Sequence, residues 1–355
     1  MKNNLKILFS LLAIIFISAC SLIGSGNDGG IFRSDDGGKT FTPKVRAENN
    51  QIINGVDVLS LAINPQNGSE VYAGSKTSGI FKSTDGGELW KQLAVSQLTP
   101  LKIYSLAIDP MDPKIIYAVS VIGKRGKIIK STDAGETWKD TYSEPSDGTL
   151  VLSVAVNPQK PENIFAGTDQ GQIIFSEDAG ETWRSSYWTE GNEAVYKIAF
   201  DNVNPDIVYF ALFEKGVLRT TNEGKSFEAL NRKTNENAFL FANGLNGTIS
   251  IEADPSREGW VYAGTTEGLL RSKDKGDNWE VIKTLNKPNE FGIRSIAINP
   301  QNSEEIICIV EQVLYKSIDG GVNWLPVQFD ANRTLETIEY NPHNPEQVFV
   351  GLNKR

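Results

Sequence analysis

Short segments of alternating apolar and polar residues recur along the chain and end in Asn or Asp, usually followed by Pro. They are SLAINP at Ser60, SLAIDP at Ser105, SVAVNP at Ser153, KIAFDN at Lys197, SIEADP at Ser250, SIAINP at Ser295 and TIEYNP at Thr337. A period of two residues indicates β-strands. Asn-Pro and Asp-Pro predict a turn after each strand, because Pro has no amide proton to donate to a neighbouring strand.

A second pattern alternates with these segments along the chain: a strand-like stretch such as GIFKS, then Asp, Gly and an aromatic residue. Its copies are SDDGGKTF at Ser34, STDGGELW at Ser83, STDAGETW at Ser131, SEDAGETW at Ser176, TTNEGKSF at Thr220, SKDKGDNW at Ser272 and SIDGGVNW at Ser317. Successive copies start 44 to 52 residues apart. That spacing is typical of a four-stranded propeller blade.

Each unit therefore reads as strand A, a turn, strand B, a loop, strand C, the Asp-Gly-aromatic turn (the box turn) and strand D. The chain starts with strands C and D (GGIFRSDDGGKTF) and ends with strands A and B (ETIEYNPHNPEQVFVG). Together these two halves make one blade. We predict an all-β fold, a single seven-bladed β-propeller over residues 29–355, closed by pairing the N-terminal strands C and D with the C-terminal strands A and B.

The box turn resembles the Asp-box, or bacterial neuraminidase repeat, of sialidases, xyloglucanases, sortilin-type receptors and photosystem II assembly-factor propellers. The resemblance implies a propeller and does not imply one activity, since these families share the turn and differ in function. We interpret the box side chains as braces of the turn, because identical groups spread round a ring cannot meet at one reacting atom. The residues are Asp36, Asp85, Asp133, Asp178, Asn222, Asp274 and Asp319.

The first 19 residues have the layout of an export signal, with Lys2 and Lys6 ahead of a short apolar run. The run closes on Ile-Ser-Ala-Cys, which resembles a bacterial lipobox with Cys20 as the lipidated residue. We predict a signal peptide over 1–19, a lipidated Cys20 with a flexible tether over 20–28, and attachment to a bacterial cell envelope, facing the periplasm or the cell surface. An ordinary secretory signal with an incidental Cys is the alternative.

Charge and composition exclude several classes of function. The chain carries 44 acidic and 35 basic residues, a net charge of −9, and one histidine. An acidic body does not attract nucleic acid through its overall field, so we expect no nucleic-acid partner. A single histidine gives no support to histidine-based triads or multi-histidine metal sites, and we expect no metal, no cofactor and a monomer.

Variation among the A strands marks the candidate site. We expect ligands on the face formed by the loops that enter strand A and join B to C, at the mouth of the central channel. The residue just before each SLAI-type segment lies near the axis, and four of these residues would make a polar, aromatic mouth. They are Tyr104, Tyr196, Arg294 and Glu336.

Deeper in the same strands, Glu252 and Glu339 interrupt a column of alanines, and Lys197 interrupts a neighbouring column of Ser and Thr. The two acids could serve as a glycosidase pair. We favour the alternative that they are hydrated in the channel or paired with Lys197.

Aromatic residues in two loops offer further contacts for a sugar or a protein, unless they fold back onto the blade edges. They are Tyr187, Trp188, Phe239 and Phe241.

Enzymes of the resembling families need features that this chain lacks. A sialidase would need an arginine cluster and an Arg-Ile-Pro-like segment, and no Arg here precedes Ile-Pro; Arg33, Arg219 and Arg271 directly precede box residues instead. Xyloglucanase-like enzymes pair two propellers round a cleft, whereas this chain predicts one. We therefore favour a non-catalytic, membrane-anchored scaffold that binds a protein or glycan at the channel mouth. The alternative is a glycoside hydrolase that uses Glu252 and Glu339.

Overall fold

The structure, a computed structural model, describes residues 29–94, 101–213, 215–230, 244–286, 290–327, 329 and 331–354. The predicted signal peptide, Cys20 and its tether lie outside these residues, as do Phe239 and Phe241. Within the described ranges, no helix has the length and apolar character needed to cross a membrane.

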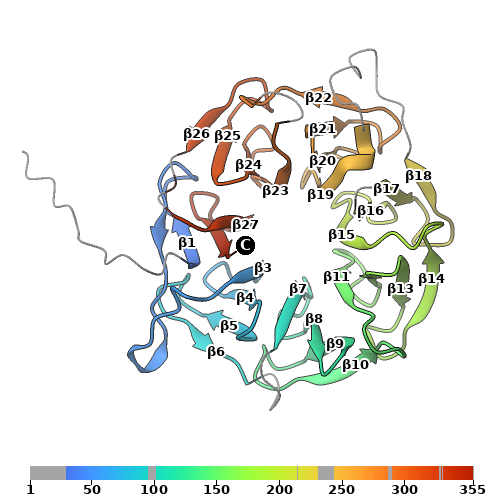
Figure 1. Ribbon diagram of the computed structural model, residues 1–355, viewed down its shortest axis with the longest axis horizontal. Coiled ribbons are helices and arrows are strands. Elements are labelled where there is room, and N and C mark those ends of the chain that lie inside the picture. The colour runs from blue at the N-terminus through green and yellow to red at the C-terminus, as the bar shows by residue number, and fades with distance from the viewer. Residues whose placement is uncertain are drawn as a thin grey trace, which may run out of the picture.

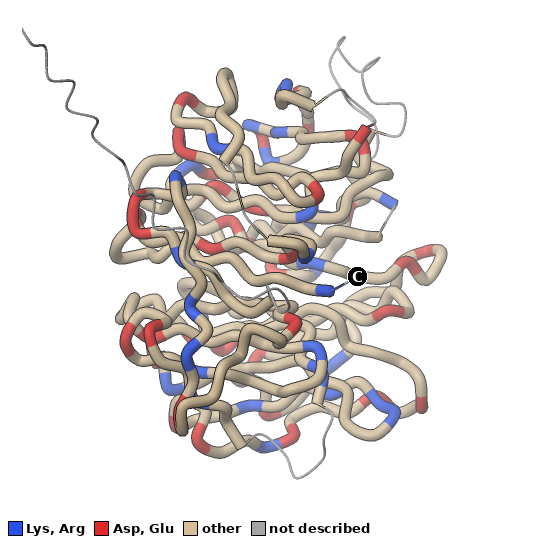
Figure 2. The backbone as a smooth tube through the Cα atoms, turned by 60° about the vertical axis from the view of Figure 1, so that its left-hand side comes forward, with Lys and Arg blue, Asp and Glu red and all other residues tan. Residues whose placement is uncertain are grey.

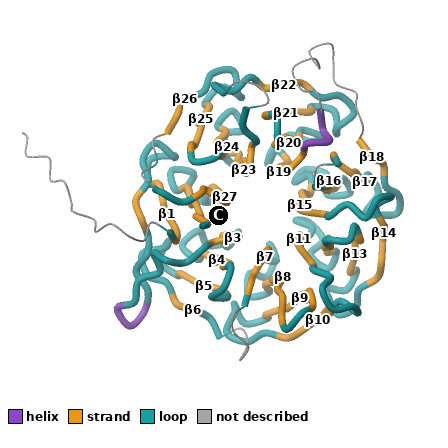
Figure 3. The backbone as a smooth tube through the Cα atoms, viewed as in Figure 1, coloured by secondary structure: helices purple, strands orange, loops and turns teal. Residues whose placement is uncertain are grey.

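Seven four-stranded antiparallel sheets stand round a central channel, which confirms the predicted seven-bladed propeller (Figure 1). Strands dominate the described residues, and the two short 3-10 helices, η1 (Glu48–Asn50) and η3 (Gly244–Gly247), lie in loops (Figure 3). In six blades the strands follow chain order from the channel outward, as A, B, C and D. Strand A of each blade therefore lines the channel.

The strand bounds by blade are as follows. Three blades contain β3 (Val58–Ile63), β4 (Val71–Ser75), β5 (Ile80–Ser83) and β6 (Lys91–Gln92); β7 (Lys102–Ile108), β8 (Ile116–Ile122), β9 (Arg125–Ser131) and β10 (Lys139–Ser143); and β11 (Val151–Val156), β12 (Ile164–Thr168), β13 (Gln172–Ser176) and β14 (Arg184–Trp188). The next three contain β15 (Val195–Phe200), β16 (Val208–Leu212), β17 (Gly216–Thr220) and β18 (Glu228–Leu230); β19 (Thr248–Ala253), β20 (Val261–Thr265), β21 (Gly268–Ser272) and β22 (Glu280–Ile282); and β23 (Ile293–Ile298), β24 (Ile306–Val310), β25 (Val313–Ser317) and β26 (Leu325–Val327). The seventh contains β27 (Thr334–Tyr340), β28 (Val348–Asn353), β1 (Gly30–Ser34) and β2 (Thr42–Pro43).

The two chain ends close the ring as predicted. Strand β1 lies between β2 and β28, and its pairing with β28 runs from Gly30 opposite Leu352 to Ser34 opposite Val348. The seventh blade thus has strands A and B from the end of the chain and strands C and D from its beginning. No blade is left with an open half-sheet.

The hydrophobic core lies between blades and not within them. Strands B and C present apolar side chains on both sheet faces, and all five residues of β4 are buried. One cluster joins Tyr72 and Ile80 of the first complete blade to Ile103 and Ile116 of the next. Because each sheet buries its faces only against its neighbours, a single blade has no core of its own.

The box turns are braced by their own side chains. In the third box, Asp133 Oδ1 accepts hydrogen bonds from Ser131 Oγ and the Thr137 amide, both at 2.8 Å, and its Oδ2 accepts one from Thr137 Oγ1 at 2.6 Å. The Thr137 hydroxyl and amide hold the pKa of Asp133 down to about 2. Asn222 accepts the equivalent amide bond from Ser226 at 2.9 Å, which explains how an amide substitutes for the acid in the fifth box.

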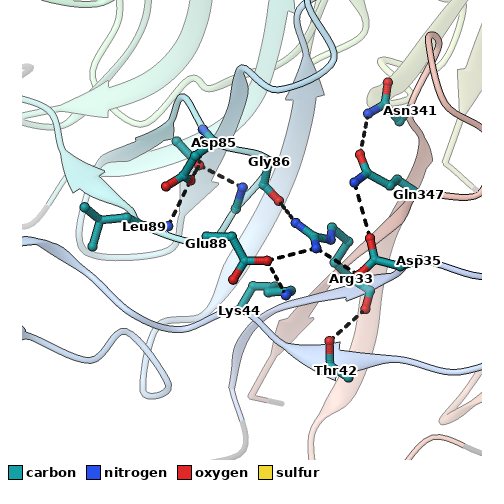
Figure 4. A network of polar contacts seen from close by, with 12 residues as sticks. Arg33, Asp35, Thr42, Lys44, Asp85, Gly86, Glu88, Leu89, Asn341 and Gln347 are labelled. Atoms are coloured by element: carbon teal, nitrogen blue, oxygen red, sulfur yellow. Dashed lines mark hydrogen bonds and ion pairs between the residues drawn. The ribbon is translucent and has the colours of Figure 1, made fainter.

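A cation on strand C ties most blades to the next one. Its side chain donates to the carbonyl of the residue that follows the box Asp or Asn in the neighbouring blade, as Figure 4 shows for Arg33 and Gly86. The pairs are Arg33 with Gly86, Lys82 with Ala134, Arg219 with Lys275, Arg271 with Gly320 and Lys316 with Gly37. The last pair joins residues 279 positions apart and fastens the seam of the ring. The arginines that precede box residues therefore have a structural partner.

Truncation after Gln347 should open the ring, because it removes β28 and leaves β1 without its partner. Four apolar side chains of β28 (Val348, Phe349, Val350 and Leu352) are fully buried. At roughly 1.5 to 3 kcal/mol each, their loss is comparable to the whole stability of a typical domain. We expect no cooperative thermal transition by circular dichroism and rapid limited proteolysis. Removal of Arg355 alone is the control, and an unchanged melting temperature after loss of β28 would contradict closure by these strands.

Candidate functional site

The channel has two different ends. In every blade a backbone amide of the box turn donates to a carbonyl of the turn between strands A and B, so these turns share one face, which we call the turn end. The donors and acceptors are Gly37 and Glu346, Gly86 and Ser69, Ala134 and Lys114, Ala179 and Glu162, Glu223 and Asp206, Lys275 and Gly259, and Gly320 and Glu304. The loops that enter strand A and join B to C form the opposite end, the mouth.

Every A strand carries a β-bulge where it approaches the mouth. The pairing of strand A with strand B shifts register by one residue in all seven blades, and the residue passed over is in each case the predicted mouth position. These residues are Leu59, Tyr104, Leu152, Tyr196, Ile249, Arg294 and Glu336. A bulge leaves its extra residue out of the ladder and redirects the side chain. The fold therefore sets the most variable residue of each A strand apart from the strand pairing.

The structure brings the four predicted mouth residues into one electrostatic neighbourhood. Arg294 Nη1 lies 3.6 Å from Glu336 Oε2, and Asn353 Nδ2 donates to the same oxygen at 3.4 Å. Burial raises the pKa of Tyr196, and Glu336 and Tyr104 raise it further while Arg294 lowers it. Tyr196 is 44% exposed, so a ligand in the channel can reach it.

Two further residues extend the mouth beyond the sequence prediction. Lys102 Nζ lies 4.2 Å from the centre of the Tyr104 ring, and the Phe213 ring lies 5.8 Å from the Tyr196 ring. Lys102 stands two residues before Tyr104 on β7, where strand alternation places both side chains on one face. Phe213 follows β16, and only the pairing of β15 with β16 brings it to Tyr196. Cation and aromatic rings together make the mouth amphipathic.

The aromatic residues of β14 do not belong to the mouth. The Tyr187 ring stacks on Phe227 of the next blade at 4.7 Å and is partly buried in the core. The alternative, that it folds back onto a blade edge, is the arrangement observed. Trp188 is 52% exposed but lies on an outer strand, away from the channel (Figure 1).

The two inner glutamates face a cavity of about 230 Å³ at the turn end of the channel. Besides Glu252 and Glu339, its lining includes Asn202, Tyr340 and the prolines Pro255, Pro300 and Pro342 of three successive A–B turns. The acids and the mouth residues therefore occupy separate ends of the channel. Among the described residues, no group of three or more His, Cys, Asp or Glu side chains is arranged to hold a metal ion.

Lys197 is the nearest cation to this acidic pair. Its Nζ lies 4.0 Å from Glu252 Oε2, and the two side chains are 34% and 36% exposed to the channel. Burial raises the pKa of Glu339 to about 7; Lys197 opposes the rise and Glu252 adds to it. Burial also raises the pKa of Glu252, against the opposing charge of Lys197. Pairing with Lys197 is thus observed, although it does not offset the loss of solvation.

Comparison with known proteins places the chain among propellers of this type. A family model described as Sortilin-Vps10 (sortilin, neurotensin receptor 3) matches residues 126–261. A xyloglucanase of a Paenibacillus species is 26% identical over 185 residues, which cover 47% of this chain and 17% of the relative. The chain thus corresponds to about a sixth of that relative's length.

Solved structures share the fold at low sequence identity. The GH74 xyloglucanase of Xanthomonas campestris has a TM-score of 0.69 at 16% identity, over 84% of this chain and 51% of that one. YCF48 from Cyanidioschyzon merolae has a TM-score of 0.64 at 14% identity, over 83% of this chain and 95% of that one, and YCF48 bound to D1 peptide has 0.62 at 15%, over 83% and 92%. The chain spans half of the xyloglucanase and nearly all of YCF48. These likenesses establish the propeller and leave the activity open.

Replacement of Glu339 by Gln should stabilise the protein at alkaline pH. The folded-state pKa of about 7 lies above the ordinary value of 4.5, so folding favours the protonated acid. That contribution is present below pH 4.5 and is lost as the pH rises through 7. We expect Glu339→Gln to raise the melting temperature at pH 8 by about 2 °C and to leave it unchanged at pH 4.5. Equal melting temperatures at pH 8 would show that Glu339 ionises without penalty.

Proposed function

We propose that the protein is a non-catalytic binding propeller that holds a protein or glycan partner at its channel mouth. The observation that carries the proposal is the coincidence of sequence variation with the bulges: Tyr104, Tyr196, Arg294 and Glu336 all stand at the redirected position of their strands. Aromatic faces pack against sugar rings or apolar peptide groups, and the Arg294–Glu336 pair offers hydrogen-bond donors and acceptors of both charges.

The surroundings of the mouth suit such a role. Strand A is held by its blade and by both neighbouring blades, so the mouth side chains stand on a rigid frame, which limits the entropy lost on binding. Acidic and basic residues are interspersed along the backbone in the view of Figure 2. Recognition then depends on the local arrangement at the mouth. A related propeller has been solved with a peptide bound, which supports a binding role without fixing the partner.

Truncation of the mouth side chains should weaken partner binding. We expect Tyr196→Ala and Arg294→Ala each to weaken binding by about 30-fold, as loss of a central contact typically does. The measurement is affinity on an oligosaccharide array that includes xyloglucan fragments, together with biolayer interferometry against peptides of cell-envelope proteins. Trp188→Ala distinguishes the outer rim from the mouth. Loss of binding in Trp188→Ala, with normal binding by the two mouth variants, would refute the proposed site.

A glycoside hydrolase remains the second candidate, and a specific observation favours it. Glu339 holds its proton near neutral pH beside a second carboxyl group, Glu252, as a general acid and its partner would. The cavity that holds them, however, is smaller than the roughly 300 to 1,000 Å³ of most ligand sites. Release of reducing ends from xyloglucan that disappears in Glu252→Gln would replace the binding proposal with this one.

We further propose that lipidation of Cys20 anchors the body to a bacterial membrane through the tether of residues 20–28. The apolar run and the residues before Cys20 support this part of the proposal. The full-length protein should partition into the detergent phase of Triton X-114, and Cys20→Ser should move it to the aqueous phase. Detergent partitioning that survives Cys20→Ser would mean that another segment provides the attachment.

A further inference from the structure

The turn end of the channel differs from the mouth in shape and in charge. Five of seven blades present alanine at the same height of strand A, and only β19 and β27 present glutamate. The alanine side chains leave space near the axis that larger residues would fill. The cavity of about 230 Å³ lies in this part of the channel.

The cavity has apolar and polar parts, and two glutamates form its acidic pole. Ile63 and the three turn prolines belong to the apolar part, Asn202 and Tyr340 add polar atoms, and Glu252 and Glu339 supply the charge. At about 30 Å³ for each water-sized group, the space holds roughly seven non-hydrogen atoms. This volume fits a short aliphatic chain that carries one polar group.

The negative charges of the acidic pole, Glu252 and Glu339, are not fully balanced by nearby positive charge. Glu252 and Glu339 come from β19 and β27, and Lys197 from β15 is the charged group that faces both of them. One lysine against two ionised carboxylates leaves a net charge of −1 in this part of the channel. At 4.0 Å, the contact between Lys197 Nζ and Glu252 Oε2 is an ion pair too long for a direct hydrogen bond. The carboxylates therefore retain acceptor capacity for a donor that enters the cavity.

We propose that this cavity binds a small aliphatic primary amine as its ammonium ion. The –NH₃⁺ group supplies three donors and the missing positive charge, and its alkyl chain packs against the proline and aliphatic wall. The site is separate from the mouth, so the inference stands whether or not the mouth binds a protein or a glycan. Binding requires that Glu339 be ionised, so the ligand displaces the proton that Glu339 otherwise carries.

Isothermal titration calorimetry with n-pentylamine tests the proposal on the folded protein. We expect a dissociation constant on the order of 1 mM at pH 8 for a ligand of this size. The affinity should fall about tenfold at pH 6, where Glu339 is protonated. Binding at pH 6 should also release close to one proton, measured by comparing buffers of different ionisation enthalpy. The neutral isostere n-pentanol should bind at least about tenfold more weakly at pH 8.

Three substitutions test whether the charged residues of the acidic pole determine amine binding. Glu252→Gln and Glu339→Gln should each weaken pentylamine binding about tenfold, and Glu339→Gln should abolish its pH dependence. Glu258→Gln is the matched control, since Glu258 is an exposed carboxylate of a neighbouring turn paired with Lys275 and does not line the cavity. Lys197→Met should strengthen binding at pH 9, because the competing cation is gone; misfolding would weaken binding, so this direction cannot arise from damage.

Certain results would overturn the inference. Equal affinity for pentylamine and pentanol would show an apolar cavity with no role for the acids. Calcium chloride that binds more tightly than the amine and displaces it would identify an inorganic cation site. Absence of any pentylamine heat at 50 mM ligand, with a normally folded protein, would show that the cavity does not admit the amine.

Discussion

Closure of the ring is the constraint on which the rest of the structure depends. The apolar clusters lie between neighbouring blades, so each blade depends on its neighbours for a core. The meeting point is the pairing of β1 with β28, reinforced by the hydrogen bond from Lys316 to Gly37 across the same seam. The contacts that form this closure join the two ends of the chain, so folding depends on residues more than 270 positions apart.

The box turn serves this closure. Its Asp satisfies amides of its own turn, while the carbonyl of the next residue accepts a hydrogen bond from a strand C cation of the preceding blade in five of the seven junctions described. The final glycine of each turn has positive φ and lies close to a core side chain of the adjacent blade; a Cβ on Gly276 would stand 2.5 Å from Leu230. The repeat is therefore uniform because it is a blade junction, and a uniform element carries no information about a ligand.

Functional side chains can be placed only at positions where the sequence can vary without disturbing the blade junctions. The A strands meet that condition at two heights: the bulged residue at the mouth and the alanine column near the turn end. At the mouth, substitutions add aromatic rings and an Arg–Glu pair. At the other height, two glutamates face a small cavity and share one lysine. The two ends of the channel thus present different side chains, and each is a candidate recognition site on the same frame.

Much of this could be predicted from the sequence, and particular residues show where prediction stopped. The spacing of the seven box turns and the half-blade at each terminus determined the fold, because both depend on local period and on order along the chain. The same alignment of repeats picked out Tyr104, Tyr196, Arg294 and Glu336. It could not show that each lies on a bulge, since a bulge is a property of pairing with strand B.

Long-range packing decided the rest. Tyr187 looked like a loop aromatic until the structure placed it against Phe227 of the next blade. Glu252 and Glu339 lie 87 positions apart in the sequence, and only the curvature of the ring brings them to one cavity with Lys197. Sequence by itself determined what repeats, because repetition is encoded within each unit of the chain. The tertiary structure decided which of the residues that depart from the repeat come together, because their proximity depends on how seven units close round an axis.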